Sequence, residues 1–255
     1  MRLFLLPLLA VMAAGCVSNS TTEVRTSDQP GVVDHKRRAQ VHVALASEYY
    51  QRGIYPIALE ETRLALKDDP SLVTSYNMQG LIYMELRDDV QARAAFEQAL
   101  RIAPNDGDSM NNYGFFLCLR GEGDRGMEYL RRVQGNTLYN APEKPLLNAG
   151  LCERIRGRFP EAIDYFGRAV AYNPNLLVAL YNLADIHYQR GAMQDAQNYY
   201  QRYSKLADPT AAALALGVRI ARGMGDRASE ESLTQQMRRR YPDAPQTREI
   251  LDKHS

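Results

Sequence analysis

Cysteine, histidine and acidic side chains are the residues of this 255-residue chain that could carry chemistry. The three cysteines are Cys16, Cys118 and Cys152, and the four histidines are scattered without the spacing of metal ligands. No serine, cysteine or pair of carboxylates forms a recognisable catalytic set. The sequence therefore predicts a protein that is not an enzyme and that has no metal site, no cofactor and no small-molecule substrate.

Two short stretches imitate ligand-binding motifs. Residues 121–126, GEGDRG, match the dinucleotide fingerprint G-x-G-x-x-G, but they follow a helical pattern instead of the strand that this fingerprint needs. Residues 105–108, NDGD, resemble the start of a calcium loop, yet the acidic residue due later falls at Phe116. Both stretches are predicted to be turns between helices.

The elements that position these residues are helices, and residues 143–176 show the pattern best. Apolar or small residues recur there at helical spacing, in two sets separated by Gly157 and closed by Pro174. Spacing of this kind predicts two amphipathic helices, with small residues where the helices touch closely. The two sets are Leu146, Ala149, Gly150 and Ala162, Phe166, Ala169.

The same pattern recurs along most of the chain. The closely packed small residue returns as Ala46, Gly80, Gly114, Gly150, Ala184 and Gly217, with gaps of 34, 34, 36, 34 and 33 residues. This periodicity resembles the tetratricopeptide repeat (TPR). The resemblance implies an all-α fold, a right-handed superhelix (α-solenoid) of about six repeats within residues 36–255. The expected repeats are approximately 39–72, 73–106, 107–142, 143–176, 177–209 and 210–242.

Two repeats depart from the pattern. The third has Gly126 where alanine is usual, Leu130 where phenylalanine is usual, and two extra residues in 134–140. The sixth is degenerate after Gly225, as a capping repeat can be.

TPR arrays bind partners in an inner groove lined by the first helix of each repeat. Apolar and aromatic residues predominate at the corresponding positions, so the resemblance implies a segment with apolar anchors as the ligand. A Lys/Asn/Lys/Arg clamp for a C-terminal carboxylate is not seen in successive repeats. For any single residue, ordinary packing is the alternative. The predicted protein-binding residues are Tyr50, Asn77, Leu81, Met84, Asn111, Phe115, Leu151, Tyr181, Asp185 and Tyr188.

The N-terminus reads as a secretory leader, residues 1–15. A positive end at Arg2 precedes about 13 mostly apolar residues, too few for a membrane-spanning helix, which needs about 20. The ending Ala13-Ala14-Gly15-Cys16 resembles the lipobox of bacterial lipoproteins, although leucine is usual at Ala13. Cleavage by an ordinary signal peptidase is the alternative.

The lipobox resemblance implies that Cys16 carries acyl chains, palmitate among them, which together anchor the protein to a membrane stably. Val17 is not the aspartate that retains such proteins in the inner membrane, which implies the outer membrane, facing the periplasm. Residues 16–35 are polar and read as a lipidated flexible tether.

Cys118 and Cys152 lie one repeat apart, on neighbouring first helices of the predicted array. The periplasm is oxidising, and the geometry allows the approach that a disulfide needs, so we expect a disulfide bond. Two free, buried cysteines are the alternative.

Together, the lipobox, the tether and six repeats with cysteines in the third and fourth resemble the PilF/PilW family of type IV pilus biogenesis lipoproteins. That family acts as a pilotin, so the resemblance implies that the chain binds the secretin subunit and assists its localisation and multimerisation, and hence pilus (fimbrium) biogenesis and twitching motility. The alternative is a TPR scaffold for peptidoglycan hydrolases or synthases, or for another envelope assembly complex. Without Arg2 the charges balance at 30 basic and 30 acidic residues, which argues against nucleic acid as a partner.

Overall fold

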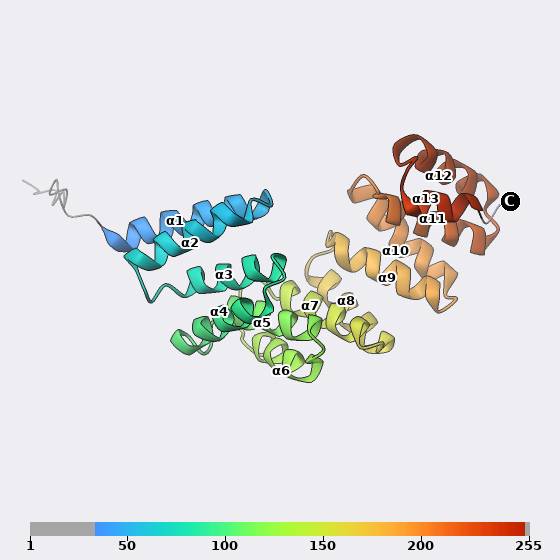
Figure 1. Cartoon of the computed structure of the whole chain (residues 1–255). Coiled ribbons are helices and arrows are strands. Elements are labelled where there is room, and N and C mark those ends of the chain that lie inside the picture. The colour runs from blue at the N-terminus through green and yellow to red at the C-terminus, as the bar shows by residue number, and fades with distance from the viewer. Residues whose placement is uncertain (1–33, 253–255) are drawn as a thin grey trace, which may run out of the picture. The chain divides into compact units, whose positions relative to one another are not determined.

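The computed structural model describes residues 34–252, and these residues form thirteen α-helices and no strand (Figure 1). The predicted leader 1–15, Cys16 and the tether up to residue 33 lie outside the described residues. The helices are α1 (His35–Gln51), α2 (Tyr55–Asp68), α3 (Val73–Glu85), α4 (Asp89–Ile102), α5 (Gly107–Leu119), α6 (Gly123–Gln134), α7 (Glu143–Ile155), α8 (Phe159–Tyr172), α9 (Leu177–Gln189), α10 (Met193–Leu206), α11 (Ala211–Met224), α12 (Arg227–Arg240) and α13 (Pro245–Asp252).

Helices α1 to α12 form six consecutive pairs, each joined by a short turn. Glycine ends the first helix of five pairs in the left-handed region, with φ between 72° and 79°. Glycine adopts this conformation without a steric penalty, which suits it to the position just after a helix. The second pair is the exception, because Arg87 occupies the same position with φ 59°.

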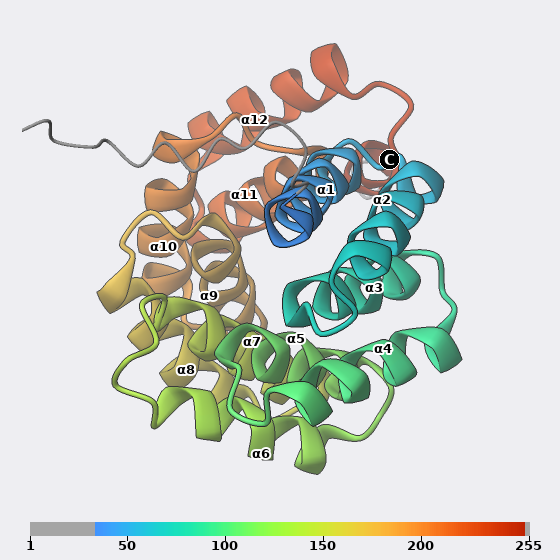
Figure 2. The same ribbon diagram turned by 90° about the vertical axis from the view of Figure 1, so that its left-hand side faces the viewer.

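Successive pairs stack through their first helices. The helix α3, for example, contacts its partner α4 and the next first helix, α5. Each second helix contacts the following first helix but not the following second helix. The array therefore bends with the first helices on its inner side and the second helices on its outer side, as Figure 2 shows for α5, α7 and α9 against α6, α8 and α10. The predicted all-α superhelix is confirmed.

Small residues let the two helices of a pair approach each other. A Cβ atom added to Gly80 would lie 2.5 Å from the ring of Phe96, and one added to Gly150 would lie 2.6 Å from the ring of Phe166. Both rings are fully buried. In these pairs the glycine makes the space that the phenylalanine fills, which is the physical reason for the repeating pattern.

The extra residues of the third repeat are held against α5. The Tyr139 ring lies on Gly107, where an added Cβ would be 2.5 Å away, and its hydroxyl donates a hydrogen bond of 2.7 Å to Asp108. Burial, and then the Asp108 carboxylate, raises the pKa of Tyr139, so the phenol stays protonated as a donor. The Tyr139 side chain therefore attaches the connection 135–142 to the start of α5.

The C-terminal end of the array is capped by α13, which packs on α11 and α12. Ile250 lies in one buried cluster with Leu214 and Met237, and the Thr247 hydroxyl donates to the Tyr241 carbonyl. The sixth pair is regular despite its degenerate sequence, because α12 runs without interruption from Arg227 to Arg240. The sequence did not predict α13 as a separate helix.

Candidate protein-binding groove

The ten predicted groove residues all come from first helices, α1, α3, α5, α7 and α9. Nine of them are half-buried, so their side chains can contribute both to packing and to a surface. Asn111 differs, because it is 3% exposed and its amide is bonded to neighbouring asparagines. The prediction that Asn111 contacts a ligand is corrected accordingly: it supports the wall of the groove from beneath.

The apolar residues at the N-terminal end differ in how firmly they belong to the core. Leu81 and Met84 pack against the buried cluster that contains Phe96 and Phe116. Phe115 is half-buried and is not among the residues that pack against that cluster. Of these three residues, Phe115 is therefore the best candidate for contact with a partner.

Tyr50 adds a polar contact to this end of the groove. Its ring centroid lies 5.8 Å from that of Tyr55, and its hydroxyl is 3.4 Å from a carboxylate oxygen of Glu85. Burial, followed by the charge of Glu85, raises the pKa of Tyr50 to about 12. At neutral pH the hydroxyl is therefore a hydrogen-bond donor.

A chain of asparagine side chains crosses three first helices. Asn148 donates to Asn111 at 3.0 Å, Asn111 donates to Asn112 at 3.1 Å, and Asn112 donates to Asn77 at 3.1 Å. Each amide still has donors or acceptors beyond those it uses in the chain. The three helices α3, α5 and α7 are thus held in register by one polar network.

Sequence reasoning selected Asn77 and Asn111 but missed Asn112 and Asn148. The signal was present, since Asn112, Asn148 and Asn182 recur with gaps of 36 and 34 residues. These gaps place the three at one repeat position, where a polar residue conflicts with a buried helix face unless it finds a partner.

The charge at Asp185 is balanced within the chain. Arg154 on α7 reaches α9, where its guanidinium donates to Asp185 and to Asn182. Gln189 also donates to Asp185, at 2.9 Å. Asp185 therefore ties two first helices together, and a basic group of a ligand would have to compete with Arg154 for it.

An apolar cavity of about 300 Å³ opens where α9 approaches the start of α11. The rings of Tyr181 and Tyr203 lie 5.9 Å apart in its wall, and burial raises the pKa of Tyr181. A cavity of this size accepts one large apolar side chain. Its other lining residues are Leu177, Val178, Thr210 and Ala212.

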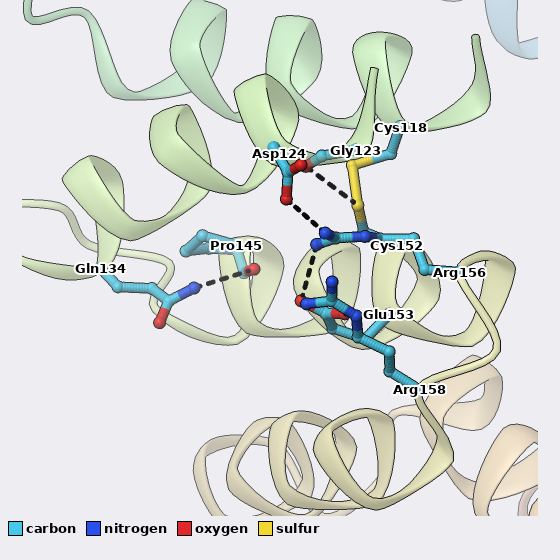
Figure 3. Close-up of a disulfide and its surroundings, with 9 residues drawn as sticks. All are labelled: Cys118, Gly123, Asp124, Gln134, Pro145, Cys152, Glu153, Arg156 and Arg158. Carbon is cyan, nitrogen blue, oxygen red and sulfur yellow. Dashed lines mark hydrogen bonds and ion pairs between the residues drawn. A yellow bond between two sulfur atoms is a disulfide. The ribbon is translucent and has the colours of Figure 1, made fainter. Parts of the chain in front are cut away.

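Cys118 on α5 and Cys152 on α7 are joined by a disulfide, with Cα atoms 5.3 Å apart and an S–S distance of 2.01 Å (Figure 3). Both residues are buried. The free-thiol alternative therefore does not describe this structure. The bond links two neighbouring first helices, and so two successive pairs.

Gly126 leaves room for this bond, and Gly123 leaves room for the Arg156 side chain beside it. A Cβ atom on Gly126 would lie 2.5 Å from the Cys118 sulfur, and the Gly123 carbonyl oxygen lies 3.9 Å from the Cys152 sulfur. The glycine that breaks the repeat pattern in the third unit is thus explained by the disulfide beneath it. Beside the bond, Arg156 pairs with Asp124 and with the buried Glu153, which adds a polar contact between α6 and α7 (Figure 3).

The described residues contain no cluster of three or more histidine, cysteine or acidic side chains that could hold a metal ion. Within the same residues, no helix is long and apolar enough to cross a membrane. The predicted groove residues are apolar and aromatic side chains, amides, and the carboxylate of Asp185, which is paired within the chain.

Paired helices that repeat every 34 residues or so, with first helices on the inner side, define a tetratricopeptide-repeat protein. Models of the tetratricopeptide repeat match residues 73–106 and 154–220. The described residues form an all-α superhelix of tetratricopeptide repeats.

Among proteins of this class, the chain is similar to PilF and PilW. It is 27% identical over 241 residues, 94% of either chain, to the type IV pilus assembly protein PilF of Pseudomonas aeruginosa PAO1. The crystal structure of PilW, described as a widely conserved type IV pilus biogenesis factor, superposes with a TM-score of 0.76 and 29% identity, covering 84% of this chain and 98% of that one. A structure of P. aeruginosa PilF has the same fold, with a TM-score of 0.75, 24% identity and coverage of 86% and 99%.

Proposed function

We propose that this chain is a lipid-anchored protein of type IV pilus biogenesis that acts as a pilotin. In this proposal the inner groove binds the secretin subunit and assists its localisation and multimerisation in the outer membrane. The observation that carries the proposal is the similarity to PilF along 94% of both chains, because it extends over the whole array and not over one repeat.

The groove suits a protein ligand. Phe115 and the cavity beside Tyr181 offer apolar contacts at two separate places along the first helices. Asparagine amides lie between them and can satisfy main-chain groups of a bound segment. Apolar anchors supply most of the binding energy at such interfaces, and polar groups fix register.

The anchor supplies the second half of the mechanism. In this proposal, acyl chains on Cys16 hold the protein at the periplasmic face of the outer membrane. The residues between Cys16 and α1 link the anchor to the array, which would keep the groove near a secretin that inserts in the same membrane. Secretin subunits would therefore meet one another at a high effective concentration. In this mechanism the chain binds and positions its partner and catalyses no reaction.

A secretin multimerisation assay tests the function. Cells that lack this chain are expected to contain secretin monomers in place of heat-resistant oligomers, to lose twitching motility, and to recover both when the wild-type chain is restored. Cys16→Ala is expected to abolish palmitate labelling and to leave the secretin away from the outer membrane. Normal secretin oligomers without this chain would contradict the pilotin role and favour a scaffold for cell-wall enzymes. Palmitate labelling that persists in Cys16→Ala would rule out the lipid anchor at Cys16.

A further inference from the structure

A second cleft lies on the outer side of the array, away from the inner groove. The helices α10 and α12 both pack on α11 but do not contact each other. Between them lie two cavities of about 450 and 600 Å³, whose walls share Tyr200 and Leu233. Gly217 of α11 contributes to the floor. The two cavities therefore form one cleft that follows the length of α10 and α12.

Tyr200 lines both cavities, and its hydroxyl group lacks a hydrogen-bond partner in the described part of the chain. Its side chain stands at the repeat position that Phe96 and Phe166 occupy in other pairs. The residue is 6% exposed, and its hydroxyl has no hydrogen-bond partner among the described residues. A Cβ atom on Gly217 would lie 2.3 Å from this hydroxyl, so the ring reaches past its own pair to the next first helix.

A buried hydroxyl without a partner destabilises a fold, and phenylalanine would avoid that cost while giving up only the oxygen that lies over Gly217. The other pairs have phenylalanine, leucine or, in the first pair, Thr62 at this position, and the buried Thr62 hydroxyl donates to the Leu59 carbonyl. The Tyr200 hydroxyl has no such partner among the described residues. The hydroxyl is explained if a bound group accepts its hydrogen bond.

The rims of the cleft are polar and uncharged near Tyr200. Gln197 and Gln201 lie on α10, and Ser229 and Ser232 lie on α12. Amides and hydroxyls both donate and accept hydrogen bonds, as main-chain peptide groups require. Residues four apart on a helix are about 6 Å apart along its axis, close to the roughly 6.6 Å between alternate residues of an extended chain.

The other end of the cleft is basic. Lys205 and Arg240 line it, next to the exposed Asp208, which lies 3.5 Å from Arg240. Arg238 and Arg239 precede Arg240 on α12, so positive charge exceeds negative charge at this end. An acidic side chain of a ligand would be attracted there.

We propose that the cleft between α10 and α12 binds an extended polypeptide segment of a partner protein. The segment is uncharged and polar in its middle, where its main chain meets the two glutamines and accepts a hydrogen bond from Tyr200. It is acidic at the end that meets Lys205 and Arg240. This site is separate from the inner groove and does not depend on the pilus function.

A random hexapeptide phage library, selected on the immobilised full chain, is the probe. Selected peptides are synthesised and their affinities measured by fluorescence anisotropy. We expect a consensus of serine, threonine, asparagine or glutamine followed by aspartate or glutamate. Tyr200→Phe should weaken these peptides about tenfold, the effect of one hydrogen bond. Lys205→Glu should remove the preference for the acidic end. Tyr199→Phe is the matched control, because Tyr199 lies on the same helix but lines neither of the two cavities, and it should leave affinity unchanged.

Stability of the variant separates ligand binding from structure. Tyr200→Phe should unfold at the same temperature as the wild type or higher, because it removes only an unpartnered hydroxyl. A lower unfolding temperature would show that the hydroxyl has an internal role and would overturn the proposal. The proposal would also be overturned if Tyr200→Phe weakened the binding of none of the selected peptides. Binding of chitotetraose that is lost in Tyr200→Phe, with no peptide behaving so, would assign the cleft to a glycan and reject the peptide.

Discussion

Gly126 lies directly over the sulfur of Cys118, at a distance where an added Cβ would come within 2.5 Å of that sulfur. The same Cβ would lie 2.5 Å from the Gly114 carbonyl oxygen. Gly126 is therefore the residue that allows α5 and α6 to close over the disulfide.

Gly126→Ala should consequently destabilise the array by about 1 to 3 kcal/mol, the usual cost of overpacking. Urea denaturation measures the change. Gly135→Ala is the control, because the nearest atoms to an added Cβ there are 3.6 Å away and its φ is −77°. If both variants unfold at the same urea concentration, the close contact at Gly126 is relieved by a backbone shift.

Loss of the disulfide should weaken the junction of the third and fourth pairs. The bond closes a loop with a sequence separation of 34 residues. On the chain-entropy model such a loop stabilises the fold by about 3 to 4 kcal/mol, an upper estimate because stacked helices already restrict the chain. Reduction, or Cys152→Ser, should lower the unfolding temperature and increase proteolysis within residues 134–142. Thiol titration of unfolded, unreduced protein should find no reactive thiol at Cys118 or Cys152; two such thiols would contradict the bond.

Arg87→Gly should stabilise the protein. Arg87 has φ 59°, a conformation that costs a side-chain-bearing residue about 1 to 2 kcal/mol relative to glycine, partly offset by the greater freedom of glycine in the unfolded chain. We expect a net gain of about 1 kcal/mol in the free energy of unfolding. Gly157→Ala, at the corresponding turn with φ 74°, should lose a similar amount. A neutral result for both variants would mean that this turn tolerates side chains.

Docking of α1 should be sensitive to acid. Only Ala39 and Ala46 of α1 are buried, so polar contacts matter for it, and the Arg38 guanidinium pairs with Asp68 at the end of α2. That hydrogen bond, with a smaller contribution from His35, holds the pKa of Asp68 well below its ordinary value of 3.8. A lowered folded pKa means that the stabilisation is present above about pH 4 and is lost as the pH falls through the folded pKa.

Limited proteolysis of α1 between pH 3 and pH 7 measures this effect. The wild type should become more susceptible as the pH falls below about 4. Asp68→Asn should be susceptible throughout that range and should show less dependence on pH. A pH dependence that is equally steep in Asp68→Asn would assign it to another carboxylate.

Two apolar residues of the groove should respond differently to the same change. Phe115→Asp should abolish capture of the secretin subunit while circular dichroism stays helical, because Phe115 is not among the residues that pack against the cluster of Phe96 and Phe116. Leu81→Asp should reduce stability as well, because Leu81 packs against the cluster of Phe96 and Phe116. Val90→Asp, at a second-helix residue that is 76% exposed, is the control and should change neither property. Undiminished capture by Phe115→Asp would move the binding surface elsewhere.

The helix pairs and the disulfide could be predicted from the sequence, because both depend on residues that recur at the repeat period. A small residue such as Gly150 and a large one such as Phe166 must recur together, because one makes the space that the other fills. Two cysteines one repeat apart lie on neighbouring first helices for the same reason of periodicity.

Contacts that depend on side-chain conformation could not be predicted in this way. Tyr139 could have faced solvent from an irregular connection, yet it docks on Gly107. Asn111 occupies a position that faces the groove in an ideal repeat, but hydrogen bonds to its neighbours draw it beneath the surface. Arg87 adopts the left-handed conformation at the turn where the other five pairs have glycine. The packing of the pair outweighs the local cost in conformational free energy.

The disulfide between α5 and α7 also governs how the array would respond to pulling. If force is applied at the two ends of the chain, the segment between Cys118 and Cys152 cannot unravel while the bond is intact. A stretch with a sequence separation of 34 residues would otherwise release roughly 110 to 120 Å of contour length. Under load, the third and fourth pairs therefore share a covalent link at their junction, and extension must come from residues outside the segment 118–152.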